Sequence, residues 1–335
     1  MRALQFWAES IHNIIVVDGS KNPLSASSIP RDGDNISYYH LPVTWGERLS
    51  FAASKVETDY VVMVSDDEYY IPSCLEKSVQ FLDLNKDYVA CVGRCLGFYY
   101  RSGKVYGRQV YPQLRDYEVV AKDASARVVY HMENYVMSLL WAVTRTSAWR
   151  SAADTYAREE FRVYCQAELQ FEMILSFAGK SRVIPELGWL RSLGENDSIV
   201  DLEPGLDSSS PMDIFSRDSG RAHEFQRFVN VMSDTFYSLG CSDFKHSRNT
   251  VISGVEAYVR FLEKSRKNRK IYLGLARYLP KSIKNFLRRV LSLLLRNESV
   301  SLVSAARSLE LEGVSVDFSN IDKVEKSLLS FYRDR

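Results

Sequence analysis

Short apolar runs alternate with helix-patterned segments along the first third of the chain. The apolar runs predict strands at 14–17, 36–40, 60–64 and 88–93. The segments between and before them predict helices at 1–13, 47–55 and 73–84. Because strands that alternate with helices favour parallel pairing through crossover connections, this pattern predicts an α/β fold with a mostly parallel sheet flanked by helices.

The pattern is less regular in the middle of the chain. Residues 97–130 are rich in Tyr, Arg and Gly and have no helical period, which predicts hairpins or loops over the sheet. Helices are predicted at 134–150 and 156–178. Gly179 is expected to close the second of these helices as a C-cap, and a strand is expected to follow, ahead of Pro185.

Three regions follow from these changes of pattern. An α/β domain is expected over residues 1–200. The stretch 201–220 is polar and rich in Ser, Asp, Gly and Pro, which indicates a linker or loop. Residues 221–335 have a helical pattern and predict a helical carboxyl-terminal region, which contains a basic amphipathic helix at 280–296.

The composition is that of an ordinary globular protein. The chain has 335 residues, of which 46% are hydrophobic and 25% are charged. It has no apolar run close to the ~20 residues that a membrane-spanning helix needs, and no signal-peptide pattern at its start. Its five cysteines are odd in number and show no CxxC spacing, which fits reduced thiols. We therefore expect a cytoplasmic protein.

The charge is distributed unevenly along the chain. Between Arg260 and Arg296 there are twelve Lys/Arg and one acid, whereas the rest carries 31 basic and 41 acidic side chains. A cationic helix with one apolar stripe is typical of helices that lie in a membrane interface. Residues 271–296 are therefore predicted to hold the protein, as a peripheral component, on the inner face of the cell membrane.

The basic segment could instead pack on the first domain or bind nucleic acid. A helix packed on the first domain would account for the apolar stripe, but not for the number of cations around it. Nucleic acid is not expected as a partner, because no recognisable nucleic-acid-binding module accompanies the segment.

The strand predicted at 60–64 ends in three consecutive acids, Asp66, Asp67 and Glu68. Acids at the carboxyl end of a strand lie where open α/β sheets bind their ligands. Their hard oxygen atoms suit Mg²⁺ or Mn²⁺. The alternative is a solvated acidic turn that opens the helix after Pro72, since acids favour helix N-termini.

Several short motifs occur in a characteristic order along the chain. Asp18-Gly19-Ser20 follows the first predicted strand, Gly46-Glu47-Arg48-Leu49 opens the next helix, and Ser65-Asp66-Asp67-Glu68 ends the strand after it. Glu168 lies eleven residues before Gly179, and a strand ending in Pro comes next. In this order and spacing, residues 1–195 resemble the GT-A glycosyltransferases and are similar to bacterial relatives of glycosyltransferase family 2.

The resemblance implies a binding site for a nucleotide-sugar donor. Asp18, together with Ser20 of the same loop, would contact the base or ribose of the nucleotide. Arg48 and Asp66 would lie near the diphosphate, which a guanidinium can hold through two hydrogen bonds. From the residues alone, Asp18 could equally form an ordinary Asp-Gly turn, and Arg48 could be a surface charge of its helix.

The resemblance also implies a metal ion and a general base. Asp67 and Asp66, with Glu68 as a further candidate, would hold Mn²⁺ or Mg²⁺, which offsets the charge of the leaving nucleoside diphosphate. Glu168 matches the family's general base, which takes the proton of the acceptor hydroxyl. The first acid of the family's pair is replaced by Ala167, and Glu172, one helical turn later, is the alternative base.

The implied function is the transfer of a sugar from a nucleotide-sugar to a hydroxyl of a glycan or lipid-linked acceptor. The reaction is expected to be inverting and metal-dependent, and to serve bacterial surface polysaccharide assembly. Domains of this family normally open with a strand upstream of the first helix, so that strand is expected to be missing or truncated. Alternatives are a sugar nucleotidyltransferase, or a catalytically degenerate module that acts as a membrane-associated scaffold or glycan binder.

Overall fold

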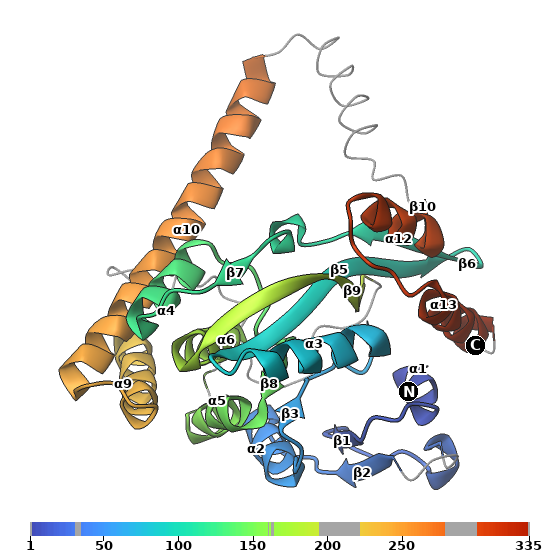
Figure 1. Ribbon diagram of the computed structural model, residues 1–335, viewed down its shortest axis with the longest axis horizontal. Helices are drawn as coiled ribbons and strands as arrows, with labels where there is room; N and C mark the ends of the chain where they lie inside the picture. Colours follow the sequence, from blue (N-terminus) through green and yellow to red (C-terminus); the bar gives the residue numbers. More distant parts are fainter. Residues whose placement is uncertain are drawn as a thin grey trace.

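The molecule is built around one long, twisted pair of strands, with helices on both sides (Figure 1). The computed structural model describes residues 2–30, 35–159, 161, 164–193, 222–278 and 300–333. Within these ranges, no helix is both long enough and apolar enough to cross a bilayer.

The chain begins with a small parallel sheet. After helix α1 (Arg2–Ala8), strands β1 (Ile14–Asp18) and β2 (Ile36–His40) pair from Ile14 opposite Ile36 to Asp18 opposite His40. Their connection includes the short helix η1 (Ala26–Ser28). Both strands lie where the apolar pattern predicts them.

Helix α2 (Trp45–Lys55) follows and has a clear local cause. The Thr44 hydroxyl accepts a hydrogen bond from the Glu47 N–H, and the Glu47 carboxylate accepts one from the Thr44 N–H. This capping box satisfies two backbone donors that have no partner inside the helix.

The main sheet has eight strands among the described residues. They are β3 (Tyr60–Val61), β4 (Tyr69–Tyr70), β5 (Tyr88–Arg101), β6 (Lys104–Gln109), β7 (Glu118–Val119), β8 (Val143–Arg145), β9 (Lys180–Ser192) and β10 (Val300–Ser301). One path of neighbours runs β10-β6-β5-β8-β3, and β9 joins it by pairing with β5, β4 and β7.

The α/β class and the helical carboxyl-terminal region are confirmed, but a mostly parallel sheet is wrong for the main sheet. Of its described pairings, β5–β9 is parallel and the others are antiparallel. One reason is local: β5 turns directly into β6 through Ser102 and Gly103, which have φ of 49° and 77°. Positive φ at both turn residues makes a tight hairpin, which can join only antiparallel strands.

The strand predicted at 60–64 is shorter than its sequence indicates. Pairing with β8 covers Tyr60 and Val61, whereas 62–64 are partly buried residues that pack against the core without being in a strand. Helix α3 (Pro72–Leu84) follows close to its predicted position, with Pro72 in its first turn.

The helix predicted at 134–150 is wrong. Helix α4 (Ala124–Glu133) comes before this range, and helix α5 (Thr146–Arg158) begins only after β8. The segment 134–142 stays out of a helix because the carboxylate of Glu172 accepts the backbone N–H groups of its centre. Tertiary contacts therefore override the local helical pattern.

The helix predicted at 156–178 corresponds to α6 (Tyr164–Ala178), but its end is not the expected C-cap. Gly179 is not among the residues with positive φ. A Cβ at this position would come within 2.3 Å of the Val89 side chain. Gly179 is needed for this close approach between the helix end and β5, rather than for a left-handed turn.

The helical carboxyl-terminal region packs on the first domain at two places. Helices α9 (Ala222–Ser238) and α10 (Phe244–Tyr278) lie beside α4 and α6, and α10 then projects away from the body (Figure 1). Helices α12 (Leu302–Leu311) and α13 (Phe318–Arg333) lie against β6 and α1. The linker expected at 201–220 and the basic helix expected at 280–296 lie outside the described residues.

The end of α12 is tied to the main sheet through charged side chains. Arg94 on β5 is 6% exposed, and its Nη2 atom lies 3.6 Å from the Glu312 carboxylate. Gln109 of β6 donates a hydrogen bond to the same carboxylate. Close by, Ser315 exchanges backbone hydrogen bonds with β9, at Leu187 and Pro185. The carboxyl-terminal segment thus supplies the anion for a buried cation of the sheet.

Replacing Glu312 with Ala is expected to lower the free energy of unfolding by about 1–2 kcal/mol, because the Arg94 guanidinium stays buried without its anion. Urea denaturation of the full chain measures this loss. Glu310→Ala is the matched control, since Glu310 is an exposed acid of the same helix. Equal stabilities of the two variants would contradict the role given to this ion pair.

Candidate active site

The Asp18-Gly19-Ser20 turn closes β1, and its carboxylate is tightly held. Asp18 accepts hydrogen bonds from the Ser20 N–H at 2.8 Å and from the Tyr38 hydroxyl at 2.5 Å. Partial burial alone would raise the pKa of the Asp18 carboxyl, but these hydrogen bonds lower it below its usual value. Asp18 is therefore ionised and fixed in direction at neutral pH.

Arg48 of α2 lies directly over this turn. A Cβ built on Gly19 would come within 1.8 Å of the Arg48 Nη1 atom, so the guanidinium rests against the glycine backbone. The same nitrogen donates to the Val43 carbonyl at 2.8 Å. The structure thus brings together the predicted residues Asp18, Ser20 and Arg48, and gives Gly19 a reason for having no side chain.

Exposure falls along the acidic motif after β3, from Asp66 to Glu68. Asp66 is exposed and Asp67 is partly buried in a turn, whereas Glu68 is buried, with 6% exposure. The Glu68 carboxylate accepts a hydrogen bond from Trp189 Nε1 at 2.6 Å, and its other oxygen lies 3.8 Å from Arg191 Nε. Burial raises the pKa of Glu68 to about 7 against the effect of the Trp189 hydrogen bond.

This arrangement bears on the predicted metal site. The inward contacts of Glu68 argue against it as a ligand, which leaves Asp66 and Asp67. Among the described residues, no group of three or more His, Cys, Asp or Glu side chains is placed to hold a metal. Two carboxylates still fit Mg²⁺ or Mn²⁺, because such ions are often held by one or two carboxylates together with water and substrate phosphates. Metal binding stays a prediction.

An aromatic cluster surrounds the inward acid. Arg191 lies over the ring of Tyr111, at 5.3 Å from its centre, and over that of Trp189, at 5.7 Å. Pairing of β4 with β9 sets Tyr69 opposite Leu190, which brings Arg191 next to Glu68. Trp189 was missed by sequence reasoning. Its position within an apolar strand gave no sign that its indole would bond to an acid more than a hundred residues away.

The predicted base, Glu168, lies on α6 and is partly buried. Its carboxylate accepts a hydrogen bond from the hydroxyl of Tyr135, a residue that sequence reasoning did not select. Burial raises the pKa of Glu168 to about 7; the Tyr135 hydrogen bond lowers it, and the nearby charge of Glu172 raises it. A carboxyl that titrates near neutral pH is suited to accepting a proton.

Glu172, the alternative base, is fully buried and fully engaged. It accepts backbone N–H groups from Ser138, Leu139 and Leu140 at 3.0–3.2 Å, and it lies 2.6 Å from His131 Nε2. The other ring nitrogen of His131 is 2.6 Å from the Tyr117 hydroxyl. These contacts give Glu172 a structural role and argue against it as the group that meets an acceptor.

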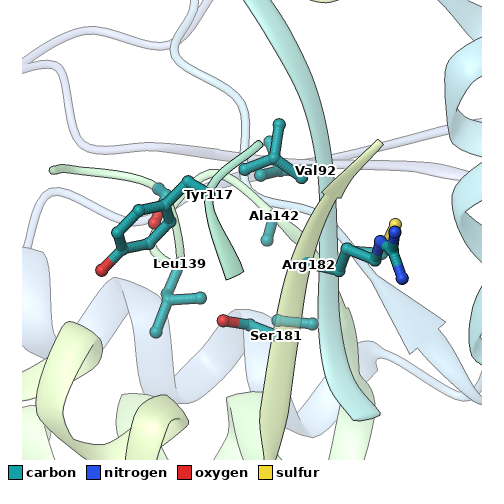
Figure 2. Close-up of a pocket in the computed structure, with 10 residues that line it drawn as sticks. Val92, Tyr117, Leu139, Ala142, Ser181 and Arg182 are labelled. Carbon is teal, nitrogen blue, oxygen red and sulfur yellow. The ribbon is translucent and has the colours of Figure 1, made fainter. Parts of the chain in front are cut away.

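A small gap lies beside this buried network (Figure 2). It is lined by residues of β5, β9 and the segments before β7 and β8, among them Val92, Tyr117, Leu139 and Ser181. Tyr117 and Arg182 lie on opposite sides of it. The gap is too narrow to admit a water molecule, so it is a packing defect rather than a donor site.

Two acids in the turn after β3 and a separate acid on α6 allow one group to hold the counter-ion of a bound anion and the other to take a proton. These two roles, holding a counter-ion and accepting a proton, are the ones that the resemblance to GT-A glycosyltransferases implies. Residues 3–133 match the family model described as Glycosyl transferase family 2. The resemblance seen in the sequence is thereby confirmed: residues 3–133 are similar to glycosyltransferase family 2. Glu168 lies beyond the matched residues.

Two solved structures of TarS from S. aureus are similar to this chain. The structure of TarS 1-349 has 12% identity and a TM-score of 0.39, and the match covers 76% of this chain and 82% of that one. A second TarS structure has 13% identity and a TM-score of 0.39, over 76% of this chain and 49% of that one. Likeness at this level carries no argument about function. None of the curated proteins matches the chain.

Replacing His131 with Ala is expected to lower the free energy of unfolding by about 1–3 kcal/mol, because it leaves the buried Glu172 carboxylate without one of its hydrogen-bond partners. Thermal or urea unfolding at neutral pH measures the loss. Glu133→Ala, on the exposed face of the same helix, should change stability by less than about 0.5 kcal/mol. A small loss for both variants would mean that the pair does not hold the 134–142 segment.

Proposed function

We propose that the chain transfers a sugar from a nucleotide-sugar donor to a hydroxyl of a glycan or lipid-linked acceptor, with inversion at the anomeric carbon. The family 2 match supports sugar transfer as the reaction class. The observation that carries the finer proposal is the contrast between Asp66 and Asp67, which lie in the turn after β3, and Glu168 on α6, whose pKa is raised by burial to about 7. Such a contrast separates a charge-holding role from a proton-accepting role.

The donor would be held at the β1 turn. The fixed carboxylate of Asp18 and the hydroxyl oxygen of Ser20 offer acceptors for a base N–H or for ribose hydroxyls. The Arg48 guanidinium, resting on Gly19, offers a planar cation for the diphosphate. Asp66 and Asp67 would hold Mn²⁺ or Mg²⁺, which when bound offsets negative charge on the departing nucleoside diphosphate.

Glu168 would act on the acceptor. Its carboxylate accepts the proton of the acceptor hydroxyl while the hydroxyl oxygen forms a bond to the anomeric carbon. The bond from that carbon to the nucleoside diphosphate breaks in the same step, so configuration is inverted. With a pKa near 7, about half of the Glu168 carboxyls are ionised at neutral pH, and each carboxylate is a stronger base than an ordinary Glu.

The setting proposed is the inner face of a bacterial membrane, in surface polysaccharide assembly. Support comes from the sequence: the basic, amphipathic pattern of 271–296 fits binding to anionic lipid. The projection of α10 away from the body would carry the start of that stretch clear of the sheet (Figure 1). Removing 271–296 should release the protein from membrane fractions in a sedimentation assay.

Arg48 and Gly19 form one unit in nucleotide binding. Arg48→Ala and Gly19→Ala should each weaken nucleoside diphosphate binding by about tenfold, because the second change pushes the guanidinium off the turn. The double variant should bind no more weakly than Arg48→Ala alone. Calorimetry with a panel of nucleoside diphosphates measures these affinities, with exposed Arg115→Ala as the control. Fully additive losses would contradict the shared role, and no binding to any nucleotide would favour the scaffold alternative.

Asp67→Asn should abolish the Mn²⁺ dependence of nucleotide binding and lower sugar transfer by at least about 100-fold. Glu68→Gln should keep the metal dependence, because Glu68 faces Trp189 and Arg191. The reverse pattern would show that Glu68, and not Asp67, is the ligand. Removing metal with a chelator should reproduce the Asp67→Asn loss in the unchanged protein.

Sugar transfer should depend on pH through Glu168. Below a pH of about 7 its carboxyl is protonated and cannot accept a proton, so kcat/KM should fall about tenfold per pH unit and reach a plateau above pH 7. Glu168→Gln should lower kcat by about 10²–10⁴. A flat profile between pH 5.5 and about 8, with Glu168→Gln still active, would remove Glu168 from the reaction.

A further inference from the structure

Tyr135 joins three elements of the structure. Its hydroxyl donates to the Glu168 carboxylate on α6. Its ring meets Tyr258 of α10 edge-on, with ring centres 4.9 Å apart, and lies 6.1 Å from the ring of Phe261 on the same helix. The His131 ring of α4 lies 6.0 Å away on another side. Tyr135 thus contacts the proposed base and the long carboxyl-terminal helix together.

The backbone that carries Tyr135 is fixed on both sides. Before it, the Asn134 N–H ends helix α4 by bonding to the Tyr130 carbonyl. After it, Ser138 and Leu139 donate their N–H groups to Glu172. Because Glu172 is one turn along α6 from Glu168, the helix that carries the base also anchors the loop that carries its hydrogen-bond donor.

We infer that Tyr135 is a positioning residue for Glu168, and that α10 holds it in place through Tyr258 and Phe261. This inference rests on the proposed function, in which Glu168 accepts the proton of the acceptor hydroxyl. A Glu side chain has several rotamers, whereas a Tyr ring packed between two helices has few. The rigid donor therefore selects the carboxylate direction in which Glu168 meets the acceptor.

The groups around Glu168 shift its pKa in opposite directions. Among the described residues, the titratable groups that face the Tyr135–Glu168 pair are Glu172 of α6, His131 of α4 and Tyr258 of α10. The hydrogen bond from Tyr135 favours the carboxylate form of Glu168, and the charge of Glu172 favours the acid form. The pKa of Glu168 is thus lower than burial and Glu172 alone would make it.

The test is the pH profile of Tyr135→Phe, which keeps the ring and removes the donor. The midpoint of kcat/KM should rise by about one pH unit from its value in the unchanged protein, because the carboxylate loses a stabilising hydrogen bond. The plateau value of kcat should fall several-fold, since the carboxylate direction is no longer fixed. Tyr130→Phe is the control, because Tyr130 is a half-exposed tyrosine of the adjacent helix.

A structural role alone would scale the whole profile without moving its midpoint. An unchanged midpoint in Tyr135→Phe, with native stability, would therefore overturn the inference. The part played by α10 is tested by Tyr258→Leu: its plateau kcat should fall several-fold while the KM for the donor stays unchanged, and Tyr258→Phe should restore activity. Equal activity of Tyr258→Leu and the unchanged protein would remove α10 from the inference.

A readout without sugar transfer separates this inference from the proposed function. Infrared difference spectra against Glu168→Gln give the titration of the Glu168 carboxyl directly, and Tyr135→Phe should shift that titration upward. If the shift occurs while Glu168→Gln still transfers sugar, the proposed base is wrong and the Tyr135 contact stands. If transfer requires Glu168, and Tyr135→Phe moves neither the midpoint of the kcat/KM profile nor that of the infrared titration, the inference is wrong. Glu168 then remains the base.

Discussion

The arrangement of the site depends on the hydrogen bonds that the buried carboxylate of Glu172 accepts. Taking a carboxylate out of water is costly unless its oxygens are fully satisfied. Here three backbone N–H groups of the 134–142 segment and the ring of His131 satisfy them. The same contacts keep that segment out of a helix, place Tyr135 against Glu168, and put a fixed negative charge one turn from the proposed base. One desolvated group thereby holds a loop in place and adds to the effect of burial in raising the pKa of Glu168.

Environment, rather than residue type, assigns the acids their roles. Asp66, Asp67 and Glu68 are consecutive, yet Asp66 is exposed and Asp67 partly buried in a turn, while Glu68 is buried in an aromatic cluster against Trp189. Glu168 and Glu172 are one helical turn apart, yet one is partly exposed and the other is fully enclosed. Among the acids at 66–68, and likewise in the pair Glu168 and Glu172, some side chains are accessible to a ligand and others make buried structural contacts. The family match ends at residue 133, so Glu168 and Glu172 both lie beyond it.

The carboxyl-terminal helices complete the domain rather than follow it. Helix α10 covers the segment that carries Tyr135, and β10 pairs with the edge of β6. Glu312 supplies the anion for the buried Arg94, and Lys323 pairs at 2.7 Å with Glu9, which directly follows α1. The sequence predicts residues 221–335 as a separate helical region. In the structure this region contributes to the stability of the sheet and to the surroundings of the proposed base.

The sequence by itself determined the features that depend on near neighbours. These are the β1 and β2 strands, α2 with its Thr44–Glu47 capping box, the α3 start at Pro72, and the family motifs that lead to Asp18, Arg48 and Asp67. Only the tertiary structure decided the strand directions of the main sheet, the loop at 134–142, the inward turn of Glu68 and the burial of Glu172. Apart from the antiparallel β5–β6 pairing, which follows from the tight turn between the two strands, each of these rests on a contact between residues far apart in the chain, such as Glu68 with Trp189 or Glu172 with Leu139. A local pattern of apolar and polar residues shows that a side chain is acidic, but it holds no information about which distant donor will satisfy it when water is removed.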